Sequence, residues 1–120
     1  MSIVSYRKLI VWQRSIELVV AIYELTKRFP MNEQFGLTAH IRKTSISIPS
    51  NIAEGKYRWT AKEYGRFLRI AYASGAELET QIIISKRTMS LPHDAYQKVD
   101  QLLDEVMRML NSMLTRLYVG

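Results

Sequence analysis

Apolar residues recur along the chain at the three- and four-residue spacing of amphipathic helices, and they do so in four separate stretches. The first helix is predicted from about Arg7 to Arg28. It ends where Phe29 precedes Pro30, because the residue before a proline is pushed out of the α region. The second helix is predicted to start near Asn32, a favourable N-cap, and to end at Gly55, a common helix stop.

The third and fourth helices have clearer start signals. Thr60 and Glu63 form the pattern of a capping box, and the third helix is predicted to run from there to about Met89. Pro92 suits the first turn of the fourth helix, where a missing N–H costs little. The fourth helix has one apolar stripe and a fully polar back, which predicts that it faces solvent. The stripe of the third helix is Tyr64, Phe67, Leu68, Ala71, Gly75, Leu78 and Ile82.

The second helix contains a stretch, Ser45–Gly55, that conflicts with its own apolar pattern. Pro49 lacks an N–H and its ring crowds the carbonyl of Ser45, so we expect a kink. A narrow set of polar residues, here called the polar seam, interrupts the apolar faces. We interpret it as a structural network that fixes the kink and the register of subunits; a ligand site is the alternative. The polar seam comprises Arg42, Ser47, Asn51, Glu54 and Glu77.

These patterns predict an all-α fold, an up-down-up-down four-helix bundle that occupies residues 1–120 as a single domain. The first three helices carry more apolar surface than one bundle core needs, and such surplus commonly marks an interface. We therefore expect an oligomer. The stripes expected to be covered by neighbouring subunits are Val11/Leu18/Ile22 and Ala39/Ile46/Ala53.

Two blocks of sequence resemble a known family. The segment SIPSNIAEG, followed by FLRIAYASGAELET, is similar to the small bacterial four-helix-bundle proteins of the 23S ribosomal RNA intervening-sequence family, over about Tyr6 to Tyr118. That family is similar in fold to the accessory variability proteins of diversity-generating retroelements, which form five-membered barrels and bind nucleic acid. The resemblance implies a ring-like homo-oligomer, a pentamer, and RNA, DNA or a nucleic-acid enzyme as partner.

Charge adds to this picture. The formal net charge is +6, which favours anionic partners, with nucleic acid first and anionic membrane second. The chain has no cysteine, which suits a reducing cytoplasm. No apolar run approaches the roughly 20 residues of a membrane span, and the start lacks a signal-peptide pattern. We therefore expect a cytoplasmic protein without a membrane partner.

The basic residues gather between the second and third helices. Arginine binds phosphate well and an exposed aromatic ring can stack on a base, so this group, here called the basic strip, is the candidate nucleic-acid interface. It carries no base-reading motif, which predicts binding to the backbone. The alternative is an ordinary solvated helix face. The basic strip comprises Lys56, Arg58, Trp59, Lys62, Arg66 and Arg69, with Tyr57 beside them.

Enzymatic chemistry has weak support. Neither His40 nor His93 follows a glutamate at the spacing of a di-iron site, so no metal and no cofactor are expected. Arg87 and His93 resemble the arginine–histidine pair of HEPN-type ribonucleases, but Pro92 and a predicted helix end separate them. The prediction is a non-enzymatic protein that binds nucleic acid. A protein–protein adaptor is the first alternative, and a HEPN-like ribonuclease is the second.

Overall fold

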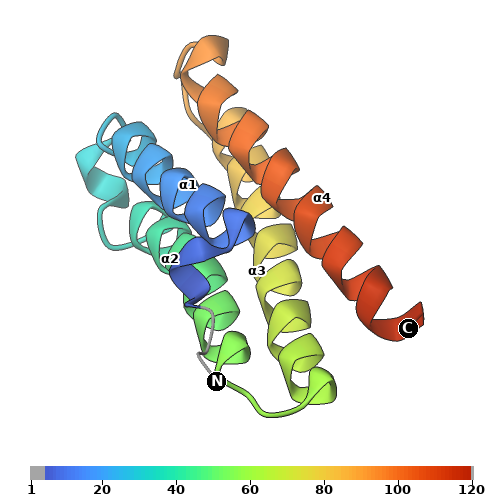
Figure 1. Ribbon diagram of the computed structural model, residues 1–120. Helices are drawn as coiled ribbons and strands as arrows, with labels where there is room; N and C mark the ends of the chain where they lie inside the picture. Colours follow the sequence, from blue (N-terminus) through green and yellow to red (C-terminus); the bar gives the residue numbers. More distant parts are fainter. Residues whose placement is uncertain (1–4, 120) are drawn as a thin grey trace.

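A computed structural model describes residues 5–119, with side chains as far as Leu117. Its elements are four α-helices and three short 3-10 turns, and residues 5–119 contain no strand. The helices alternate in direction, so the chain runs up, down, up and down through the bundle (Figure 1). This confirms the predicted all-α class. The elements in order are η1 Tyr6–Lys8, α1 Ile10–Thr26, η2 Met31–Glu33, α2 Leu37–Lys56, α3 Ala61–Thr88, η3 His93–Tyr96 and α4 Gln97–Val119.

Each helix packs against two others: α1 contacts α2 and α4, and α3 also contacts α2 and α4. The result is an elongated molecule of 50 × 24 × 20 Å. Its core is built almost entirely from aliphatic side chains contributed by every helix. Those with no exposed surface are Leu18, Ile22, Ile41, Ile48, Ile52, Leu68, Ala71, Leu78, Val106 and Leu110.

Three predicted helix starts are wrong by several residues. The first helix begins at Ile10 rather than Arg7, because Tyr6–Lys8 forms a 3-10 turn in which the Ser5 hydroxyl accepts from the Arg7 N–H. The second begins at Leu37 rather than Asn32, because Met31–Glu33 forms another 3-10 turn and Gly36 holds the N-cap position. The fourth begins at Gln97 rather than beside Pro92, because His93–Tyr96 forms a third 3-10 turn with Pro92 at its N-cap. In all three cases a short turn continues the helical spacing of the sequence without being part of the α-helix.

The start of α3 agrees with its sequence signal. The Thr60 hydroxyl accepts a hydrogen bond from the Glu63 N–H at 3.1 Å, which is one half of a capping box. The Glu63 carboxylate instead accepts from Arg66. The predicted stripe of α3 is confirmed as its inner face, where only Tyr64 remains half-exposed. The predicted solvent-facing back of α4 is likewise exposed at Gln97, Asp104 and Arg108.

Pro49 lies inside α2, and its side chain is buried. The helix continues through this proline and runs from Leu37 to Lys56. Near its end α2 comes very close to α3: a Cβ added to Gly55 would lie 2.8 Å from the Cβ of Phe67. The glycine is therefore required at this position by the separation of the two helices.

The apolar surface left open differs from the one predicted on α1. Val11, Leu18 and Ile22 are buried within the chain itself, so the prediction that neighbouring subunits cover them is wrong. The open apolar side chains of α1 are Ile10, Ile16 and Val20 instead. Helical spacing alone does not tell which stripe of α1 faces the core. On α2 and α3 the exposed aliphatic side chains are Ile46, Ile70, Ile83 and Ile84.

Candidate nucleic-acid interface

The basic strip is organised around the ring of Phe67, at the end of the bundle where α2 passes into α3. The ring is 6% exposed, and two guanidinium groups cover it. Arg58 Cζ lies 4.5 Å and Arg66 Cζ 4.7 Å from the ring centroid. Beside them the Lys56 Nζ lies 5.5 Å from the ring of Tyr64. Cation–π contacts of this kind hold the charged groups at fixed places on the surface while their polar edges stay accessible.

Trp59 is the most exposed large side chain of this region, at 95%. It lies in the connection between α2 and α3, one residue before the cap of α3. Its neighbour Tyr57 is 54% exposed and is supported edge-on by Tyr6, with ring centroids 5.8 Å apart. Tyr6 in turn packs against Trp12 at 5.1 Å. Aromatic rings presented in this way beside cations are suited to stacking on unpaired bases.

The remaining cations extend along the outer side of α3. Lys62 lies in its first turn and Arg69 two turns further on, and both are exposed. Glu63 offsets part of this charge through an ion pair with Arg66, with Nε and Oε2 3.3 Å apart. Both side chains of that pair are about half-exposed, so the pair is weak and can open when a phosphate approaches. The structure thus places the predicted residues on one end and one side of the α2–α3 pair.

The polar seam does not form one network within the chain. Ser47 Oγ donates to the carbonyl of Thr44, and Asn51 Nδ2 donates to the carbonyl of Ser47, so each is satisfied by its own helix. Glu54 and Glu77 are exposed. Arg42 turns away from these residues toward α1. Contacts of these residues across subunits stay a prediction.

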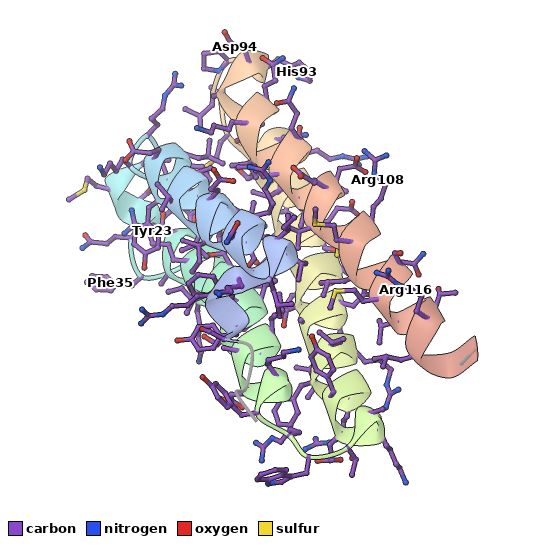
Figure 2. All side chains as sticks on the ribbon, in the orientation of Figure 1. Tyr23, Phe35, His93, Asp94, Arg108 and Arg116 are labelled. Carbon is purple, nitrogen blue, oxygen red and sulfur yellow. The ribbon has the colours of Figure 1, made fainter. Side chains whose placement is uncertain are left out.

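The histidines and the proposed nuclease pair lie at the surface. Figure 2 shows His93 beside Asp94 at the end of the molecule where η3 begins. Arg87 is in the last turn of α3 and, like His93, is exposed. Among residues 5–119 no three His, Cys, Asp or Glu side chains are grouped as a metal site would need. Within the same range, no helix combines the length and apolarity required to cross a membrane.

Comparison with known proteins settles the family. Residues 7–112 match the family described as 23S rRNA-intervening sequence protein. The chain belongs to this family. A crystal structure of a protein of unknown function from the S23 ribosomal protein family of Bacteroides thetaiotaomicron is similar, with 27% identity and a TM-score of 0.79. The match covers 88% of this chain and 98% of that one. No curated protein matches the sequence.

In this intervening-sequence protein, one residue of the candidate interface is not indicated by the sequence pattern. Phe67 was predicted only as a core position, yet its ring is also the surface on which Arg58 and Arg66 lie. The sequence does hint at this contact, because Arg66 directly precedes Phe67 and the α2–α3 turn brings Arg58 back toward the start of α3. Helical spacing reports which face a residue occupies. It does not report the path of a long arginine side chain.

Proposed function

We propose that this intervening-sequence protein is a non-enzymatic, cytoplasmic homo-oligomer that binds the backbone of RNA or DNA through the basic strip. The observation that carries the proposal is the arrangement at Phe67. Two guanidinium groups share one buried ring there, with an almost fully exposed tryptophan in the adjoining turn. Guanidinium groups bind phosphate bidentately, and a free indole offers a stacking surface for a base.

The layout of the basic strip supports binding to the nucleic-acid backbone over recognition of bases. The cations lie along a helix side and a short turn, and the sequence carries no base-reading motif. Contacts of this kind go to phosphate oxygens and set the register of the protein on the nucleic acid. We therefore expect affinity for mixed sequences, with a preference for single strands if Trp59 stacks on unpaired bases.

The ring-like pentamer belongs to the same proposal and rests on the family resemblance and on the open apolar side chains. Ile16 and Val20 of α1 and Ile46 of α2 are 36–57% exposed and lie on different helices. If the α1 side of one subunit packs against the α2 side of the next, the contact is head-to-tail, and such contacts form a ring when the rotation between subunits closes. A kink at Pro49 and a polar seam between subunits would fix the register, and each ring would repeat the basic strip.

Two measurements test this assembly. Light scattering should give several times the chain mass of 14.0 kDa. Asn51→Leu and Glu54→Leu should reduce the measured mass if the polar seam lies between subunits, because each removes a polar partner from a low-dielectric contact. A monomer at micromolar concentration would exclude the ring, whereas unchanged mass in both variants would place the seam outside the interface.

Binding is tested by fluorescence anisotropy with labelled RNA and DNA of mixed sequence at about 50 mM salt. Wild-type protein should bind both, and the double variant Arg58→Gln/Arg66→Gln should bind every sequence more weakly. Trp59→Ala should weaken single-strand binding by about 1–3 kcal/mol. The matched control is Arg108→Gln on the outer side of α4, which should bind as wild type (Figure 2).

A protein-adaptor function is the second candidate, and one observation favours it. Met31 and Phe35, in the connection between α1 and α2, are 81% and 88% exposed. Figure 2 shows Phe35 pointing away from the helices. Large apolar side chains presented this way are typical anchors of protein interfaces. Absence of any RNA or DNA binding, together with loss of a co-purifying protein in Phe35→Ser, would favour the adaptor.

A further inference from the structure

A second cationic site lies near the α1–α2 turn, far from the basic strip along α2. A cleft of about 190 Å³ opens there between the end of α1 and the first turns of α2. Its polar side chains are Thr26, Lys27, Gln34, Thr38 and Arg42, and no acidic residue lines it. Arg42 and Lys56 are 14 positions apart on α2, a separation of about 21 Å at the helical rise per residue.

Arg42 is held in a defined position beside this cleft. Its Nε donates to the Thr26 hydroxyl at 2.8 Å, and that hydroxyl donates onward to the carbonyl of Ile22, also at 2.8 Å. Its Cζ lies 4.5 Å from the centroid of the Tyr23 ring. These contacts use the Nε edge and one face of the guanidinium group. Within residues 5–119, its two terminal nitrogens form no hydrogen bond.

The half-buried charge of Arg42 also has no acidic partner among the described residues. Removing a cation partly from water without a counter-ion is unfavourable, and buried charges in proteins are normally paired. The side chain is nonetheless fixed by the Thr26 hydroxyl and the Tyr23 ring. An anion bound against its terminal nitrogens would complete this arrangement.

Thr38 gives an independent indication of a ligand. It lines the same cleft, it is 5% exposed, and its hydroxyl has no hydrogen-bond partner in the part of the chain that the structure describes. Buried hydroxyl groups are rarely left unpaired, and each such case needs an explanation. Thr38 is also the second residue of α2, where the helix dipole favours negative charge; the Glu33 carboxylate already accepts there from the Leu37 N–H at 3.4 Å.

We propose that this cleft binds a phosphoryl group, either free inorganic phosphate or the terminal phosphate of a nucleotide. The terminal nitrogens of Arg42 would bind two oxygens. The Thr38 hydroxyl oxygen is covered in this structure, so it would donate to a third oxygen after rotation about its Cα–Cβ bond. Lys27 lines the same cleft and completes the charge balance. Its pair with Glu24, with Nζ and Oε1 3.2 Å apart, involves two side chains that are each more than 60% exposed and therefore opens easily. Donors from three directions suit a tetrahedral oxyanion better than a planar carboxylate.

Thermal unfolding tests the site, with sodium phosphate replacing sodium chloride at constant ionic strength and pH 8. Wild-type Tm should rise with the logarithm of phosphate concentration above the Kd, by about 5 °C at tenfold excess. Arg42→Gln should abolish the rise. Lys43→Gln, which changes the adjacent exposed cation, should retain it. Because Arg42→Gln also loses the bond to Thr26, a second variant is needed.

Thr38→Val provides that second variant, since it keeps the shape and removes the unpaired hydroxyl. It should raise Tm in chloride, because an unsatisfied buried group is gone, and should reduce the response to phosphate. A nucleoside 5′-monophosphate identifies the source of the phosphoryl group. A larger rise in Tm with the nucleotide than with phosphate would indicate that the cleft binds the terminal phosphate of a nucleotide. An equal rise would indicate that it binds the free ion.

Three results would overturn the proposal. The first is a wild-type Tm that phosphate does not change relative to chloride. The second is a phosphate response that Arg42→Gln retains. The third combines two observations: phosphate does not change the wild-type Tm, and Arg42→Gln lowers the mass of the oligomer. Together they would show that Arg42 pairs with a carboxylate of another subunit. None of these residues belongs to the basic strip, so failure here is distinguishable from failure of nucleic-acid binding.

Discussion

Replacing Gly55 by alanine tests the close approach of α2 and α3 that positions the basic strip. The added Cβ would lie 2.8 Å from Phe67 Cβ and 3.0 Å from Tyr64 Cδ1. The favourable separation of two carbons is about 3.5–4.0 Å, so the helices must move apart. Phe67 Cβ is attached directly to the backbone of α3 and cannot turn away. Overpacking of this kind costs about 1–3 kcal/mol.

The gain in helix propensity offsets only part of that cost. Alanine is better than glycine by about 1 kcal/mol inside a helix, and Gly55 lies one residue from the end of α2, where the gain is smaller. We therefore expect Gly55→Ala to lower the free energy of unfolding by about 1–2 kcal/mol. For a chain of this length, the corresponding fall in Tm is about 4–8 °C.

Gly75→Ala is the matched control for this experiment. Its added Cβ would meet the side chain of Met107, chiefly the sulfur. Methionine has three rotatable bonds and can move aside, so this variant should stay within about 1 kcal/mol of wild type. Thermal and urea unfolding, followed by circular dichroism at equal protein concentration, measure both. A Gly55→Ala protein as stable as wild type would refute the inferred helix separation.

Two further predictions concern buried groups beside the core. Ser85 and Tyr96 share a 2.6 Å hydrogen bond and are 0% and 2% exposed, so Tyr96→Phe should cost about 1–3 kcal/mol in urea unfolding. The double variant with Ser85→Ala should recover part of that loss, and full additivity would contradict the coupling. Burial raises the pKa of Tyr64, so the neutral ring is favoured in the folded state. The resulting contribution to the free energy of unfolding is fully present below the pKa that Tyr64 has in the unfolded chain, and it is lost as pH rises above about 10. Tyr64→Phe should therefore make the loss of stability at high pH less steep.

The sequence was sufficient to predict most of the fold, for an identifiable reason. On α4 the apolar stripe is one-sided, so helical spacing alone selects the inner face, and on α3 the predicted stripe is likewise the buried one. On α1 two stripes compete. The buried one contains Leu18 and Ile22, whereas Ile16 and Val20 stay open. Only the packing of α1 against both α2 and α4 decides between them, and that information is not local in sequence.

Site residues were harder to predict because arginine side chains are long. Arg42 was assigned to the polar seam from its place on α2, yet it reaches α1 and contacts Thr26 and Tyr23. Arg58 and Arg66 both contact Phe67, and helical spacing does not indicate this common contact. Spacing fixes where a Cβ lies, whereas the bonds between Cβ and Cζ determine where the guanidinium group of an arginine lies.

The salt dependence of RNA affinity tests the central claim, phosphate binding by the basic strip, most directly. Each phosphate neutralised on a single strand contributes about −0.7 to the slope of log affinity against log salt. We expect Arg66→Gln/Arg69→Gln to reduce the steepness by about 1.4 for every sequence, while Arg108→Gln leaves it unchanged. No binding at about 50 mM salt, or equal slopes for wild type and the double variant, would contradict the claim.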